Sequence, residues 1–216
     1  MSTTHTFSKH EEIVNSITHG IGALLSIAAL VLLIVFSYSQ GTLLHVISFS
    51  IFGSTMLLLY VSSTLVHSFP PGKAKDIFEI MDHASIYLFI AGTYTPFLFI
   101  VIKGWLGWTL FGVIWGMAIL GVVFKIFFVK RFLYLSTVIY LLMGWLIVFA
   151  WKPLVSILPT GGVIWLVLGG ILYSIGTIFY MWRGFKFHHA VWHLFVLAGS
   201  IAHFFAILLY VLPIQG

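Results

Sequence analysis

Seven long apolar runs, each close to 20 residues, dominate this 216-residue chain and leave only short connections between them. An α-helix of about 20 residues crosses the roughly 30 Å hydrocarbon core of a bilayer. Lipid offers the backbone no hydrogen bonds, so only helices or a closed barrel can span it. The runs are about twice as long as barrel strands and do not alternate in polarity. We therefore expect an all-α integral membrane protein, a bundle of seven transmembrane helices.

The composition agrees, because 61% of the residues are hydrophobic and only 7% are charged. So few charges cannot cover the surface of a soluble domain of this size. We expect one membrane domain over 1–216, with a short polar tail over 1–19. Helix-stopping residues divide it into spans at 20–38, 43–66, 84–102, 105–124, 132–151, 161–181 and 190–212. The absence of cysteine excludes disulfides and thiolate metal sites.

The first run also has to be compared with a signal peptide, since Ser37-Tyr38-Ser39 is a small-x-small triplet. The run from Gly20 to Tyr38 is longer than a usual signal core, and Glu11 and Glu12 precede it instead of a positive segment. It is interpreted as a retained first span.

Basic residues indicate the orientation, because they accumulate in cytoplasmic connections. One side of the membrane receives eight of them and the other receives only Lys103 and Lys152. We therefore expect a cytoplasmic N-terminus, an external C-terminus and a location in the plasma membrane. The eight are Lys9, Lys73, Lys75, Lys125, Lys130, Arg131, Arg183 and Lys186. This scattered excess suits an anionic lipid surface and does not suggest nucleic-acid binding; membrane lipids are the expected partners, and no oligomeric state is indicated.

Polar residues gather where four of the expected spans meet the cytoplasmic side. Ionisable groups at membrane depth are costly and usually functional. Four segments far apart in the sequence bring them to one level: Asn15 and His19, Ser63 and His67, Asp82 and His83, and His188, His189 and His193. This shared depth predicts a polar site.

The spacing within these segments suits a metal. His189 and His193 are four residues apart, so both imidazoles face one side of a helix. His67 would supply a third imidazole. A catalytic zinc is typically held by three such protein ligands, with one coordination position left open. Asp82 could accept a hydrogen bond from the zinc-bound water or from a ligand imidazole. Alone, the histidine pair would more often be an interfacial or helix-packing feature; its match in depth with His67 and Asp82 favours Zn²⁺.

Other polar and small residues receive structural interpretations. His45 is expected at the surface of an external connection, and His5 and His10 in the polar tail. His203, about 15 Å deeper than His193 by helical rise, is expected to be a hydrogen-bonded packing residue. His83 and His188 point away from the predicted ligands. Six glycines are expected to allow close helix packing: Gly112, Gly116, Gly121, Gly169, Gly170 and Gly176.

The chain resembles the hemolysin III family, the bacterial branch of the progestin and adipoQ receptor superfamily. The resemblance covers nearly the whole chain. It rests on Glu12-Ile-Val-Asn-Ser-Ile-Thr-His19-Gly, Ser63-x-x-x-His67, Asp82-His-Ala-Ser, Gly92-Thr-Tyr-Thr-Pro96 and His189-x-x-x-His193, in this order.

This resemblance implies a seven-helix bundle whose topology is opposite to that of G-protein-coupled receptors, with zinc near the cytoplasmic face. Carried over by position, the ligands would be His67, His189 and His193, with Asp82 and Ser63 beside the zinc-bound water. The related receptors and the alkaline ceramidases, which look like distant relatives, suggest amide hydrolysis of a lipid. The family name comes instead from haemolytic activity attributed to some members.

Three functions remain open at this point. The first is a zinc-dependent hydrolase of lipid amides or esters, with Asp82 as general base and Ser63 holding the oxyanion. The second is a non-catalytic sensor or membrane-homeostasis protein in which zinc is structural. The third is a pore-forming cytolysin, which the retained spans support poorly.

Overall fold

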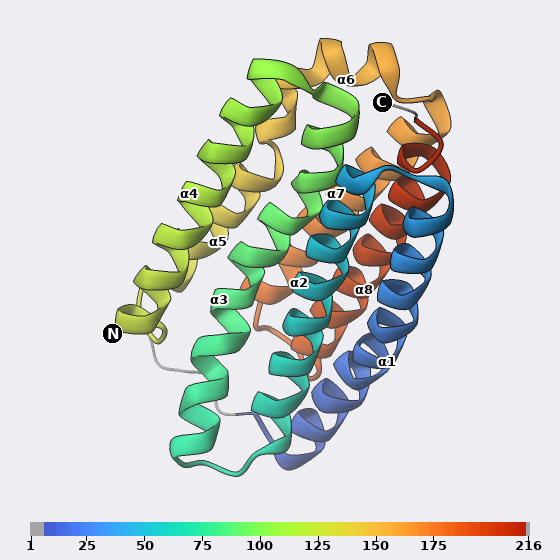
Figure 1. Cartoon of the computed structure of the whole chain (residues 1–216). Helices are drawn as coiled ribbons and strands as arrows, with labels where there is room; N and C mark the ends of the chain where they lie inside the picture. The colour runs from blue at the N-terminus through green and yellow to red at the C-terminus, as the bar shows by residue number, and fades with distance from the viewer. Residues whose placement is uncertain (1–6, 215–216) are drawn as a thin grey trace.

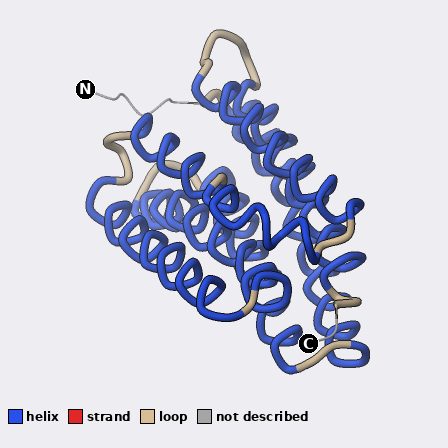
Figure 2. Tube along the Cα trace, turned by 90° about the horizontal axis from the view of Figure 1, so that it is seen from above, coloured by secondary structure: helices blue, strands red, loops and turns tan. Residues whose placement is uncertain are grey.

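The computed structural model describes residues 7–214, and seven of the helices in that part of the chain are long and apolar enough to cross a membrane. The expected helical membrane bundle is thereby confirmed (Figures 1 and 2). The helices are α1 (Lys9–Gln40), α2 (Leu43–Ser68), α3 (Lys73–Pro96) with η1 (Phe97–Ile102), α4 (Gly104–Phe128), α5 (Leu133–Gly144) with η2 (Leu146–Ala150) and α6 (Trp151–Ile157), α7 (Thr160–Met181), and α8 (His188–Ala206) with η3 (Ile207–Val211).

The third span lies at the centre of the bundle. Of its apolar window 83% is buried, against 22–44% in the other six spans. It packs against α2, α4 and α5, while α8 packs between α1 and α7. Figure 1 shows α1 beginning at the opposite end of the bundle from the end of η3. The end formed by the first turns of α1 and α3, the last turn of α4 and the connections 69–72, 129–132 and 182–187 is called the basic end below, since eight of the ten basic residues belong to it.

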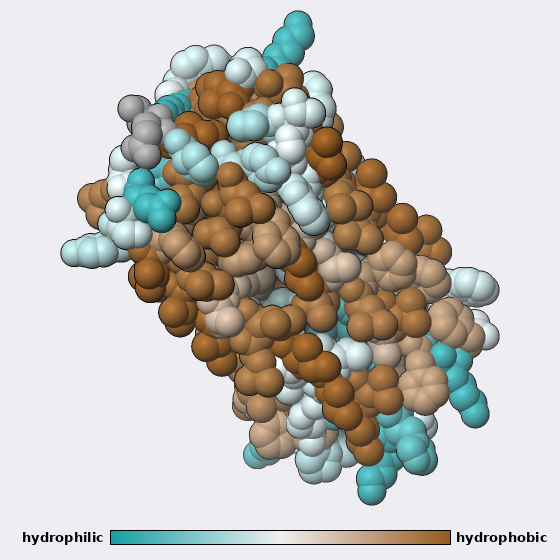
Figure 3. Space-filling model, turned by 90° about the vertical axis from the view of Figure 1, so that its right-hand side faces the viewer, coloured by the Kyte–Doolittle hydropathy of each residue, from teal (hydrophilic) through white to brown (hydrophobic). Residues whose placement is uncertain are grey.

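On the outer helices many large apolar side chains point outward, while small or polar ones point inward. In α1, Gly22 and Ser26 are buried while Leu24 and Val31 are 70% and 55% exposed. Figure 3 shows a brown, hydrophobic middle with hydrophilic residues gathered toward the two ends. In lipid this pattern is expected, because small residues let helices approach closely and apolar side chains face the acyl chains.

Two helices begin earlier than the sequence interpretation placed them. α1 starts at Lys9 instead of residue 20, because Ser8 and Glu11 form a capping box that satisfies the first backbone N–H groups. α3 starts at Lys73 instead of residue 84. Each helix therefore extends beyond its apolar run at the basic end, and carries charged residues there.

The fifth span is interrupted where the sequence predicted an unbroken helix over 132–151. A 3₁₀ segment, η2, separates α5 from α6, and the helix then continues to Ile157 past Pro153. Pro153 lies in the first turn of α6, where its missing N–H leaves no intrahelical bond unmade. The hydroxyl of Tyr94 satisfies the freed backbone, lying 2.8 Å from the carbonyl oxygens of Met143 and Gly144 and accepting from Ile147 N–H at 2.9 Å.

Three minor expectations have mixed outcomes. His45 is buried, not on the surface, because its Nδ1 accepts from the backbone N–H of Thr42 and caps α2. His203 is confirmed as a packing residue, since its Nε2 donates to the carbonyl of Leu166 at 3.1 Å. His10 is exposed on α1, and His5 lies outside the described residues.

The expectation of close packing is confirmed for three of the six glycines. A Cβ at Gly121, Gly169 or Gly176 would lie less than 3.0 Å from a side chain of another helix, whereas a Cβ at Gly170 would make only ordinary contact, 3.5 Å from the ring of Trp145. It is wrong for Gly112 and Gly116, where open space surrounds the position of a Cβ.

Candidate metal centre

Three imidazoles meet at the basic end of the bundle. His67 lies in the last turn of α2, and His189 and His193 lie one turn apart at the start of α8. One ligand atom from each lies within 4.8 Å of the other two. His67 and His193 are buried, and His189 is partly buried. The structure thus brings together the three histidines that the sequence predicted as zinc ligands.

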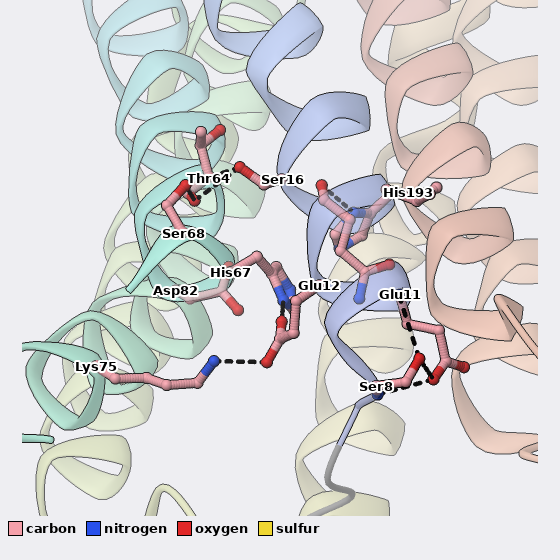
Figure 4. A network of polar contacts seen from close by, with 12 residues as sticks. Ser8, Glu11, Glu12, Ser16, Thr64, His67, Ser68, Lys75, Asp82 and His193 are labelled. Carbon is pink, nitrogen blue, oxygen red and sulfur yellow. Dashed lines mark hydrogen bonds and ion pairs between the residues drawn. The ribbon is translucent and has the colours of Figure 1, made fainter. Parts of the chain in front are cut away.

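Hydrogen bonds to Nδ1 orient two of these rings. His67 Nδ1 lies 2.6 Å from Glu12 Oε2, and His193 Nδ1 lies 3.2 Å from the carbonyl oxygen of Asn15. Figure 4 shows the contact of Glu12, on α1, with His67. A ring that donates through Nδ1 presents the lone pair of Nε2, which is the usual state of a metal-binding histidine.

The donor set fits a zinc ion. His67 Nε2 is buried and has no hydrogen-bond partner within residues 7–214, so an electrophile there would satisfy it. Imidazole nitrogens bind zinc at about 2.0–2.1 Å, which places two ligand nitrogens roughly 3.4 Å apart. The three rings need only small movements to reach that spacing.

The predicted catalytic residues lie beside these rings. Ser63 is one turn before His67 and buried, and its Oγ lacks a hydrogen-bond partner in the described part of the chain. Asp82 lies on α3, partly buried, and Figure 4 shows it beside His67. His83 and His188 are not part of the three-histidine group, and their Nδ1 atoms contact the carbonyls of Glu79 and Phe179.

Two cavities of opposite character share the wall that holds the histidines. The first, of about 140 Å³, runs between the helices and is lined mainly by apolar side chains, with Ser63, His193 and His203 on its surface. The second, of about 710 Å³, opens at the basic end and is lined by many charged side chains. Asp82 and His189 line both. A molecule in the first cavity and water from the second could therefore meet at the histidines.

The first turns of α1 contribute more to this site than the sequence interpretation recognised. His19 stacks on His193 with ring centroids 3.4 Å apart and planes 14° from parallel. The hydroxyl of Thr18 lies 3.1 Å from His193 Nδ1. The sequence contains the signal: the capping box at Ser8 and Glu11 starts a helix that places Glu12, Asn15 and His19 on one face.

Ion pairs connect α3 to the connection between α4 and α5 near the second cavity. Lys130 Nζ lies 2.8 Å from Asp76 and 3.5 Å from Glu79. The hydrogen bond to Asp76 raises the pKa of Lys130. This pairing lies at the exposed rim, where ion pairs stabilise little.

The fold and the site together define a class: a multi-pass plasma membrane protein with three histidines gathered at one end of a seven-helix bundle. The model of the family described as "Haemolysin-III related" matches residues 7–204. The chain belongs to this family, as the sequence motifs indicated.

Similarity to individual proteins extends over most of the chain. It is 59% identical over 204 residues to the "Hemolysin-3 homolog" of Bacillus subtilis (strain 168), covering 94% of this chain and 96% of that one. It is 55% identical over 203 residues to "Hemolysin-3" of Bacillus cereus, covering 94% and 93%. It is 30% identical over 166 residues to the human "Monocyte to macrophage differentiation factor", covering 73% and 67%.

Proposed function

We propose that the protein is a zinc-dependent hydrolase of lipid amides or esters, with His67, His189 and His193 as metal ligands. The observation that carries this proposal is the position of the three imidazoles, in the wall between an apolar cavity and a polar one. The acyl part of a lipid fits the first cavity by its chemistry. Water and the polar part of the substrate fit the second.

Zinc, when bound, would polarise a carbonyl group and acidify a water molecule to near neutral pH. The protein's own groups then have separate roles. The Asp82 carboxylate, which lines both cavities, would take a proton from the attacking water. The Ser63 hydroxyl, buried in the wall of the apolar cavity, would donate a hydrogen bond to the carbonyl oxygen of the substrate.

The distribution of basic residues supports a proposed orientation of the chain in the membrane. We propose that the basic end faces the cytoplasm, because it carries eight of the ten basic residues. The polar cavity would then take water from the cytoplasm.

The test is a panel of long-chain lipid amides and esters presented to the purified protein in nanodiscs with zinc. We expect at least one lipid to be cleaved, with the free fatty acid detected by mass spectrometry. The double variant His67→Ala, His189→Ala should not cleave it. Zinc binding without cleavage of any lipid beyond the level of the double variant would favour the structural role of zinc.

A further inference from the structure

Glu12 joins three helices at the histidine cluster. Its Oε2 lies 2.6 Å from His67 Nδ1 on α2, and its Oε1 lies 2.6 Å from Lys75 Nζ on α3. Figure 4 shows the carboxylate of Glu12 between these two side chains, with a dashed line to each. Both oxygens of one carboxylate are thus engaged in charge-assisted contacts.

Burial protects the contact between Glu12 and His67 from water. The side chain of His67 is 6% exposed and that of Glu12 is 21% exposed, so water competes little for either. A carboxylate can only accept, so the imidazole nitrogen that contacts it must carry the hydrogen. In a neutral His67 ring the hydrogen is therefore on Nδ1. The lone pair then lies on Nε2. Of the two ring nitrogens of His67, Nε2 is the one that is buried without a hydrogen-bond partner in the described chain.

We infer that Glu12 is a positioning residue of the metal centre, which holds the His67 ring in the tautomer and orientation that bind the ion. This inference rests on the proposed zinc site. Lys75 supports it from the other side, because its ammonium group holds the second oxygen and fixes the rotamer of the carboxylate. A carboxylate behind a metal-binding histidine raises the basicity of the ligand, and its loss typically costs 10–100-fold in metal affinity.

The contact also gives the early start of α1 a function. The capping box at Ser8 and Glu11 begins the helix just before Glu12, so the carboxylate is carried on an ordered helical turn. One turn further, the carbonyl of Asn15 engages Nδ1 of His193. The first turns of α1 therefore orient two of the three imidazoles while supplying none of them.

The experiment measures zinc affinity by chelator competition on purified full-length protein in detergent. Glu12→Gln keeps the shape but weakens the acceptor, and Glu12→Ala removes it. We expect zinc to bind about 10-fold more weakly to Glu12→Gln and up to about 100-fold more weakly to Glu12→Ala. Lys75→Met should show a smaller loss than either, since it leaves the contact between Glu12 and His67 in place.

Glu11→Gln is the matched control. It makes the same change one residue earlier. Glutamine also completes a capping box, and its amide oxygen can still accept from the backbone N–H of Phe187, which Glu11 contacts at 3.2 Å. Its zinc affinity should equal that of the wild type. The melting temperature of the metal-free protein should be similar for Glu11→Gln and Glu12→Gln, so that a difference in affinity cannot come from a loosened fold.

The outcomes separate this inference from the proposed function. Wild-type zinc affinity in both Glu12 variants, while His67→Ala loses the metal, would overturn the role of Glu12 and leave the zinc site intact. A wild-type protein that binds no zinc would remove both. Weaker binding in the Glu12 variants supports the positioning role whether or not any lipid is cleaved.

Discussion

The hydroxyl of Tyr94 on α3 lies 2.8 Å from the carbonyl oxygen of Gly144, where the helix of the fifth span is broken. A break in a membrane helix frees backbone groups that lipid cannot satisfy. The same hydroxyl accepts from Ile147 N–H on the far side of the break. One side chain of the central helix therefore makes the interruption between α5 and α6 possible. The residues around it, Gly144 and Trp145, line the apolar cavity next to the metal centre.

Replacing Tyr94 with Phe should destabilise the protein by about 1–3 kcal/mol, the usual cost of leaving a buried backbone group unpaired. Thermal unfolding of the purified protein in detergent measures the change. Tyr38→Phe is the control, because Tyr38 is 81% exposed and should lose its hydroxyl without consequence. Equal stability of the two variants would mean that the Tyr94 hydroxyl is not needed to satisfy the backbone groups at the break.

Zinc content should depend on each of the three histidines. Purified wild-type protein is expected to contain about one zinc per chain, and alanine at His67, His189 or His193 should remove it, since two remaining imidazoles hold the ion poorly. Metal analysis by mass spectrometry gives the answer. His10→Ala is the appropriate control, because His10 is exposed. Zinc retained in all three variants would contradict the assignment of the site.

Topology reporters test the orientation. A reporter at the C-terminus should read as external, and reporters in the connections 69–72 and 182–187 should read as cytoplasmic, since these two belong to the basic end. Reporters at both kinds of site that read as lying on the same side would contradict the alternation of seven spans.

Sequence reasoning reached the fold because hydropathy alone specifies seven helices in lipid. It also reached the three histidines, because their depth in the bundle follows from the ends of the spans. It did not find the contact between Glu12 and His67, which are 55 residues apart. Nor did it find the break after Gly144, because the compensating group, Tyr94, comes from another helix. Contacts between distant segments depend on how the helices rotate about their axes, which composition and spacing leave open.

Local context likewise decides what each glycine does. A Cβ at Gly121 would clash with the ring of Tyr87, which is 1% exposed, whereas a Cβ at Gly116 on the same helix would meet open space. We therefore expect Gly121→Ala to lower the free energy of unfolding by about 1–3 kcal/mol. Gly116→Ala should be neutral or slightly stabilising, because alanine favours a helix over glycine. Unfolding curves of the two variants, measured side by side, should differ in this direction; a reversed order would contradict the packing of α3 against α4.

Asp82 separates the catalytic role of zinc from a structural one. Asp82→Asn keeps a similar shape and can still hydrogen-bond, but it cannot accept a proton. If Asp82 is the general base, the variant should retain near-normal zinc content while hydrolysis falls on the order of 10²-fold or more. If Asp82 only supports a structural site, metal affinity or stability should fall, with no separate loss of activity.

Asp76→Asn, six residues earlier on α3 and paired with Lys130 at the rim, is the control for the loss of a negative charge near the second cavity. The assay compares the three proteins on the same lipid at saturating zinc, with metal content determined on each sample. Unchanged hydrolysis in Asp82→Asn would remove Asp82 from the mechanism while leaving the three histidines as the candidate metal centre.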